Sequence, residues 1–218
     1  MLSFYGGKYL MAAKRLVPPQ RAHVVEIFAG SAGFSCFFEP RQVTLIERDP
    51  VIYGVWDFLQ QSSAEDIRRL PLDVHKVDDL SPRVCQEARW LIGFWLNHGI
   101  AIPAKTRSKW ARQIAAKDVS DFRGGDGDTA AEWTNFWGRE VRERLAHNVT
   151  RIKHWTIIHD SWENAPDIRD AHWHVDPPYE RAGRSYKFNQ VDYTALAEWC
   201  YERAERYGGF VEIGRAHV

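Results

Sequence analysis

The stretch His174–Tyr179, with the sequence HVDPPY, constrains the fold of this chain more than any other. The mixed aromatic and aliphatic run that ends at Val175 predicts a β-strand. Two prolines then end it, because each fixes φ at about −65° and lacks an N–H group. Since a residue before proline is confined to the extended region, Asp176 and Pro177 should present a carboxylate and a carbonyl oxygen together. Ligands of open α/β sheets bind at this end of the strands, so we expect a planar substrate that carries an NH2 group.

A strand, a turn of small residues and a helix follow one another in the N-terminal third. His23–Phe28 reads as a buried strand, Ala29–Gly33 as the turn and Phe34–Phe38 as the helix. This arrangement brings backbone close to a nucleoside-bearing cofactor. The turn lacks the full GxGxxG spacing, which argues against a dinucleotide. A tight connection that binds nothing remains the alternative.

A second predicted strand lies within Gln42–Pro50 and ends in acid, with Glu47 17 residues after Gly30, and Pro50 then begins a helix. A carboxylate at this strand tip can accept both hydroxyls of a ribose. Upstream, the segment Phe4–Lys8 places two glycines before a short helical pattern. Free N–H groups and the Lys8 ammonium there favour an anion, although a plain N-terminal turn is the alternative.

Residues 57–151 contain no strand pattern and form a predicted helical insert. Residues 99–123 carry six cations against two carboxylates, and a long amphipathic helix is expected from Thr129 to Val149. Cations interleaved with tryptophans fit a nucleic-acid surface, although a solvated subdomain with a tryptophan core fits too. We expect the tryptophans in the core, and we expect DNA contacts from Lys105, Arg107, Lys109 and Arg112.

The sheet pattern resumes after the insert. Predicted strands at His154–His159 and before Asp176 are followed by a polar loop, 180–190, that contains Arg184 and Lys187. These two cations are further candidates for DNA contact. A helix is expected from Asp192 to Tyr207, and Gly209–Ile213 begins a fifth strand, so we expect an incomplete α/β sheet of strands one to five.

Composition excludes several classes of protein. The 218 residues hold 29 Lys and Arg against 29 Asp and Glu, so net charge does not indicate a partner. Three dispersed cysteines suggest neither disulfides nor a metal site, and no signal peptide or membrane span is evident. We expect a soluble cytoplasmic protein without metal. The tail 213–218 resembles a translated sequencing adapter, so we also expect a truncated gene product with a non-native end.

Three motifs in one order resemble the alpha group of DNA N6-adenine methyltransferases, from bacteria or phage. They are FYGGK at 4–8, EIFAGSAG at 26–33 and DPPY at 176–179. The resemblance implies a Rossmann-like S-adenosylmethionine-dependent methyltransferase domain, at 1–56 and 152–213, interrupted by a target-recognition insert at 57–151. Two departures are Ile27, where proline is usual, and Ala32, where the family has glycine.

The resemblance implies roles for individual residues. The catalytic residues would be Asp176, Pro177, Pro178 and Tyr179. Contacts to S-adenosylmethionine would come from Tyr5, Gly7, Lys8, Phe28, Ala29, Gly30, Ser31 and Asp176, with Glu47 on the ribose and Asp160, Ser161 and Trp162 beside the adenine ring. Double-stranded DNA would be the partner, and its recognition sequence and any restriction partner stay open.

The expected chemistry is methyl transfer to an adenine flipped out of the duplex. Asp176 and the Pro177 carbonyl would accept the two N6 hydrogens, and Tyr179 would stack on the base. Two alternatives remain. The first is a methyltransferase acting on another planar amine or amide, such as RNA adenine or protein glutamine. The second is a catalytically inactive DNA-binding fragment.

Overall fold

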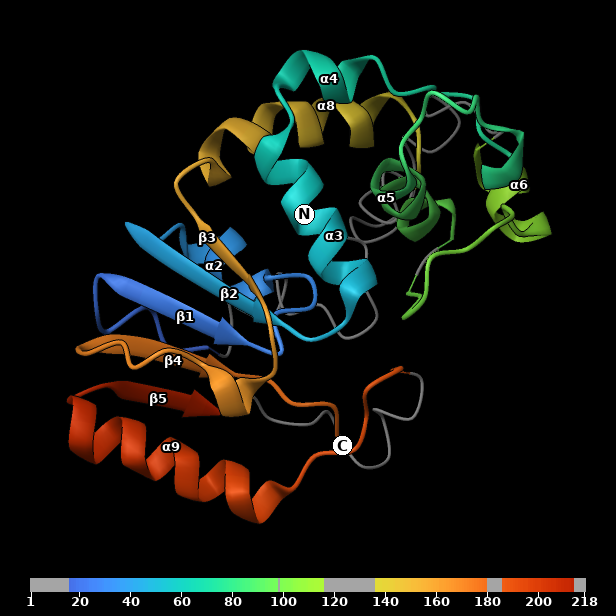
Figure 1. Cartoon of the computed structure of the whole chain (residues 1–218). Helices are drawn as coiled ribbons and strands as arrows, with labels where there is room; N and C mark the ends of the chain where they lie inside the picture. Colours follow the sequence, from blue (N-terminus) through green and yellow to red (C-terminus); the bar gives the residue numbers. More distant parts are fainter. Residues whose placement is uncertain (1–15, 98, 116–135, 180–185, 214–218) are drawn as a thin grey trace, which may run out of the picture. The chain divides into compact units, whose positions relative to one another are not determined.

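The computed structural model describes residues 16–97, 99–115, 136–179 and 186–213 of the chain (Figure 1). The chain divides into two compact units. Among the described residues, the sheet unit comprises those up to Asp57 and from His154 onward, and the helical unit comprises those within Phe58–Lys153.

The sheet unit is built on five parallel strands in the order β3-β2-β1-β4-β5 (Figure 1). The strands are β1 (His23–Ile27), β2 (Gln42–Glu47), β3 (Thr156–His159), β4 (Ala171–Val175) and β5 (Phe210–Ile213). Strand order reverses between β1 and β4, which is the switch point where open α/β sheets bind ligands. The α/β class with a parallel sheet is therefore confirmed and is compatible with a Rossmann-like fold.

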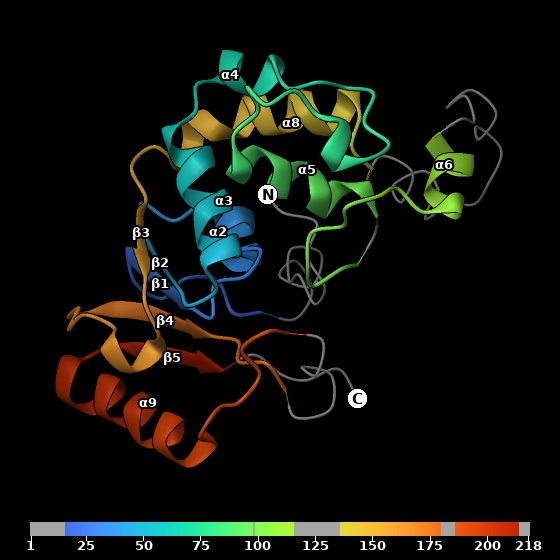
Figure 2. The same ribbon diagram turned by 45° about the vertical axis from the view of Figure 1, so that its right-hand side comes forward.

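One face of the sheet carries an apolar core beneath α9 (Tyr193–Tyr207) (Figure 2). Trp173 and Val175 of β4 pack there with Leu196, Trp199 and Cys200 of the helix. The helix begins at Asp192, whose carboxylate accepts the backbone N–H groups of residues 194 and 195, both at 3.0 Å. Such capping and burial hold the start of α9 firmly.

The opposite face of the sheet is covered by α2 (Gly33–Phe38). Residues of a strand alternate between faces, so His172 and His174 of β4 lie on this second face. The ring of Phe34 stacks on His174 at 4.5 Å between centroids. The next helix in sequence, α3 (Pro50–Gln61), leaves β2 and continues into the helical unit.

The helical unit contains α4 (Ala64–Arg68), α5 (Gln86–Leu96), α6 (Lys109–Ala115) and α8 (Arg139–Asn148) with short 3-10 turns η1 (Val77–Asp79) and η3 (Val149–Ile152). Gly93 of α5 lets the segment before α6 cross closely, because an added Cβ would lie 2.8 Å from the Pro103 side chain. Within the described residues, α8 starts later than the expected Thr129. Extended Gly138 precedes the helix, and the N–H of Trp137 donates to the Trp95 carbonyl at 2.7 Å. Among the helices in the described ranges, none has the length and apolar character needed to cross a membrane.

Candidate functional site at the carboxyl edge of the sheet

The site is built from the loops that follow β1 and β4. These strands are neighbours, and the last paired residues are Ile27 and Val175. The following residues, Phe28 and Asp176, therefore leave the sheet side by side. The register brings together the glycine turn and the Asp-Pro-Pro-Tyr motif that the sequence had predicted separately.

The loop after β1 has an unusual backbone. Phe28, Gly30 and Ala32 have φ values of 56°, 49° and 46°, which lie in the left-handed region. Only glycine adopts this region without cost, and other residues pay about 1 kcal/mol or more. Two non-glycine residues in this conformation within five positions indicate a loop held in shape by its surroundings, and such strain concentrates at functional sites.

Glu47 at the end of β2 fastens this loop. One carboxylate oxygen accepts the N–H of Gly30 at 2.9 Å, and the other accepts the N–H of Asp49 at 2.8 Å. The carbonyl of Gly30 in turn accepts the indole N–H of Trp56 at 2.8 Å. Burial raises the pKa of Glu47 to about 7, although the two N–H donors oppose the shift. Glu47 thus shapes the loop, and its oxygens retain lone pairs for a further donor such as a ribose hydroxyl.

The motif after β4 is held by two tyrosine hydroxyls. Pro177 and Pro178 are buried, and Asp176 is half-buried. The hydroxyl of Tyr179 donates to Asp176 Oδ1 at 2.9 Å. The hydroxyl of Tyr193, at the start of α9, donates to the carbonyl of Pro178. Burial and the nearby Asp176 carboxylate raise the pKa of Tyr179, so this phenol stays protonated and keeps its donor.

The turn after β3 was expected to lie beside the adenine ring of the cofactor, and in the structure its side chains have partners within the protein. Asp160 accepts the N–H of Ser161 at 2.7 Å and the side-chain amide of Asn164 at 2.9 Å, which closes the turn around η4 (Trp162–Asn164). These hydrogen bonds lower the pKa of Asp160. The ring of Trp162 is buried in the core beneath α9, edge-on to Trp199 at 5.9 Å. We therefore keep Asp160 and Ser161 as candidate cofactor contacts and assign Trp162 to the core.

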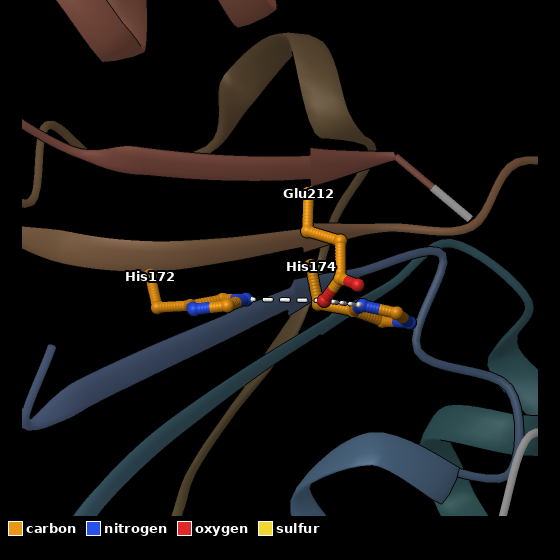
Figure 3. Close-up of side chains that lie close together, drawn as sticks. All are labelled: His172, His174 and Glu212. Atoms are coloured by element: carbon orange, nitrogen blue, oxygen red, sulfur yellow. Dashed lines mark ion pairs between the residues drawn. The ribbon is translucent and has the colours of Figure 1, made fainter. Parts of the chain in front are cut away.

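A second polar cluster lies on the α2 face of the sheet (Figure 3). The Oε2 atom of Glu212 is 3.5 Å from His172 Nε2 and 3.6 Å from His174 Nδ1. The three ligand atoms lie within 4.8 Å of one another, a spacing that suits a metal ion. However, His172 Nδ1 accepts the backbone N–H of Gln20 at 3.1 Å. The neutral imidazole must then carry its proton on Nε2, and a protonated nitrogen does not coordinate a metal.

The cluster is better described as a buried ion pair. Burial alone lowers the pKa of His174, but contact with Glu212 and the charges of Glu26 and Asp176 outweigh it and raise the pKa. Burial also opposes ionisation of Glu212, yet the two histidines lower its pKa to about 2. Glu26 accepts the N–H of Ser35 at 2.6 Å, which ties α2 to β1. Because the hydrogen bond from Gln20 fixes the His172 proton on the nitrogen that faces Glu212, we assign no function to this cluster.

The basic residues of the helical unit have different surroundings. Lys105, Lys109 and Arg112 are exposed, as the DNA-contact prediction requires. Arg107 is only 6% exposed, and its guanidinium donates to the Trp137 carbonyl at 2.7 Å. The structure thus places Arg107 in the interior, where it supports the segment between its neighbours. Trp95 and Trp137 are buried as expected, whereas Trp110 is 58% exposed, because α6 presents it to solvent.

Some predicted residues fall outside the described part of the chain, namely Tyr5, Gly7, Lys8 and Arg184. Lys187 is described and exposed, with its ammonium 5.2 Å from the centre of the Phe188 ring. The Arg48 guanidinium, which follows Glu47, also lies over this ring at 4.9 Å. The segment after the motif therefore approaches the end of β2, within the same unit.

Two residues that support the loops of the site could not be predicted from the sequence. Trp56 reads as an ordinary apolar position of α3, and Tyr193 reads as an exposed first residue of α9. Both act through a single polar atom on a neighbouring loop, 26 and 15 residues away in sequence. Helical periodicity reports the buried face of a helix, so it gives no signal for such contacts.

Comparison with known proteins adds no assignment, since no family model and no curated protein matches the chain.

Proposed function

We propose that this protein is a site-specific DNA adenine-N6 methyltransferase that uses S-adenosylmethionine. The observation that carries the proposal is the pairing of β1 with β4, which ends at Ile27 and Val175. This register makes a strained, glycine-containing loop and an Asp-Pro-Pro-Tyr motif neighbours at the switch point of a parallel sheet. Neither loop alone is specific, but the two together supply a cofactor cradle beside a pair of amine acceptors.

The proposed chemistry follows from the acceptors. The lone pair of adenine N6 is delocalised into the ring, which makes the amine a poor nucleophile. Asp176 and the Pro177 carbonyl would accept one N6 hydrogen each and direct the lone pair at the sulfonium methyl. One C–S bond breaks, one C–N bond forms, S-adenosylhomocysteine leaves and the amine releases a proton to solvent. Much of the acceleration would come from positioning and electrostatics.

Tyr179 would stack on the adenine base after the base leaves the duplex. Flipping costs a few kcal/mol of unstacking, and stacking on an aromatic ring returns about 1–3 kcal/mol per base. In the structure the Tyr179 hydroxyl is bonded to Asp176 Oδ1. A bound adenine would therefore either share this oxygen or displace the hydroxyl from it.

The helical unit would supply contacts to the duplex. Lys105, Lys109 and Arg112 are exposed, and residues 99–115 contain no acid. Such a stretch suits a phosphate backbone, and its contribution should fall as salt rises. We leave Arg107 out of this set because its guanidinium is buried.

The test is tritiated methyl transfer by the 218-residue chain. PCR-amplified bacterial genomic DNA is a suitable acceptor because its adenines and cytosines carry no methyl groups and it contains every short sequence. Total RNA and cell protein serve as parallel acceptors, and calorimetry measures S-adenosylmethionine binding. We expect cofactor binding and label in DNA alone. Label in RNA or protein would favour the alternative substrates, and DNA binding without cofactor binding would favour an inactive fragment.

A further inference from the structure

Tyr193 occupies a rigid place at the start of α9. It follows Asp192, which caps the helix by accepting two backbone N–H groups. The helix then buries Leu196, Trp199 and Cys200 in the core beneath the sheet. The Tyr193 side chain itself is 36% exposed, so its ring adds little to that core. Its position is therefore set by the capped start of the helix, and its hydroxyl makes a polar contact.

The Tyr193 hydroxyl restrains the part of the motif that the prolines leave variable. Proline fixes φ but not ψ, and ψ determines where the carbonyl points. In the motif this leaves the carbonyl of Pro178 to be oriented by something else. Tyr193 donates its hydroxyl hydrogen to this carbonyl oxygen. The hydrogen bond thereby sets the peptide plane that leads into Tyr179.

Tyr179 links the restrained Pro178 carbonyl to the Asp176 carboxylate. Its backbone begins at the Pro178 carbonyl, and its hydroxyl donates to Asp176 Oδ1 at 2.9 Å. Two tyrosine hydroxyls therefore connect the start of α9 to Asp176 through one proline. Loss of the Tyr193 hydroxyl should therefore alter the orientation of the Asp176 carboxylate and the Pro177 carbonyl. It should leave the loop after β1 unchanged.

We propose that Tyr193 is a positioning residue for the methyl-accepting amine, acting through Pro178 and Tyr179 on Asp176. This proposal rests on the proposed function. Tyr193 does not contact the reacting atoms. Its role is to hold the Asp-Pro-Pro-Tyr motif in the geometry that presents two acceptors and a stacking ring together.

The test compares Tyr193→Phe with Tyr201→Phe in the full chain. Tyr201 lies on the same helix and is 68% exposed, so its hydroxyl serves as a matched control. Loss of one hydrogen bond at Tyr193 should lower kcat about tenfold. The Kd for S-adenosylmethionine should stay within about twofold, and Tm should fall by no more than about 4 °C relative to the control, as the loss of one hydrogen bond implies. Hydrogen–deuterium exchange of peptides within residues 171–179 should become faster in Tyr193→Phe alone.

Two results would overturn the proposal. The first is a kcat equal to that of Tyr201→Phe. The second is a loss of kcat matched by equal losses of cofactor affinity and Tm, which indicates general structural damage. If the unaltered chain transfers no methyl group, the proposed function fails, but exchange still decides the structural part. Faster exchange in Tyr193→Phe supports the restraint, and unchanged exchange refutes it.

Discussion

The two loops at the carboxyl edge of the sheet are neighbours, yet they are held in different ways. The loop after β1 has left-handed residues and is fastened by backbone hydrogen bonds to Glu47 and Trp56. The motif after β4 is stiffened by two prolines and fastened by two tyrosine hydroxyls. Under the proposed function, the separate supports predict separate effects. Variants of the first loop should change cofactor binding, and variants of the second should change methyl transfer.

The largest effect should come from Asp176. Replacing it with alanine removes an acceptor of the amine, so we expect methyl transfer to fall by about 10³-fold or more. The Kd for S-adenosylmethionine should stay within about threefold, because Asp176 is one of several expected cofactor contacts and those in the loop after β1 are untouched. Asp176→Asn is the matched variant, since its amide keeps the shape and loses the charge. Retained transfer in Asp176→Ala would remove the residue from the mechanism.

The next effect should appear in the pH dependence conferred by Glu47. Its folded pKa of about 7 lies above the ordinary glutamate value of 4.5, so the folded state binds the proton more tightly. Its contribution to stability is therefore fully present below about pH 4.5 and is lost as pH rises through 7. We expect the unaltered chain to lose about 3 kcal/mol of unfolding free energy over this range relative to Glu47→Gln.

Urea unfolding at pH 5 and pH 8 measures this difference. Other titrating groups are common to both proteins and cancel in the comparison. Equal pH dependence in the two proteins would show that the folded pKa of Glu47 is not raised, because the N–H donors of residues 30 and 49 then balance the effect of burial. The same variant should weaken S-adenosylmethionine binding while Tyr193→Phe does not.

A smaller effect is expected in the helical unit. Lys109→Ala and Arg112→Ala should each weaken DNA binding by about tenfold at low salt and reduce the slope of log affinity against log salt by about one. The exposed Arg41, in the sheet unit, provides the control. Fluorescence anisotropy without cofactor measures binding apart from transfer. An unchanged slope would show that Lys109 and Arg112 of α6 do not contact DNA phosphates.

The sequence predicted where the strands lie because each is a short run of strand-forming residues bounded by a turn, and this run is buried in β1, β2 and β4. The start of β2 at Gln42 and the start of α3 at Pro50 agree with the pattern. The start of α9 after Asp192 was also predicted, because a capping residue has a local signature. Asp176 and Glu47 could be placed at strand ends for the same reason.

The rest depends on contacts between distant segments. Arg107 and Lys109 are two residues apart and equally basic, but only the fold shows that the first points at the Trp137 carbonyl. Trp110 and Trp137 look alike in the sequence, but Trp110 is 58% exposed and Trp137 is 2% exposed. The strain at Phe28 is equally invisible, since phenylalanine gives no local sign of a positive φ.

The smallest predicted effect is at Ala32, where the resembling family has glycine. Ala32 has a φ of 46°, so Ala32→Gly should relieve strain and raise the unfolding free energy by about 0.5–1 kcal/mol. Ala29→Gly is the control, because residue 29 is not among the residues with positive φ and glycine there should destabilise. Thermal unfolding of both variants checks the sign. Destabilisation by both would mean that the loop is not strained at residue 32.

The most direct test of the proposed methyl transfer is mass spectrometry of nucleosides from PCR-amplified genomic DNA after incubation with the chain and S-adenosylmethionine. We predict N6-methyladenine with the unaltered chain, and its loss with Asp176→Ala under conditions where both proteins bind the cofactor equally. Methylation at cytosine, or N6-methyladenine that persists in Asp176→Ala, would contradict it.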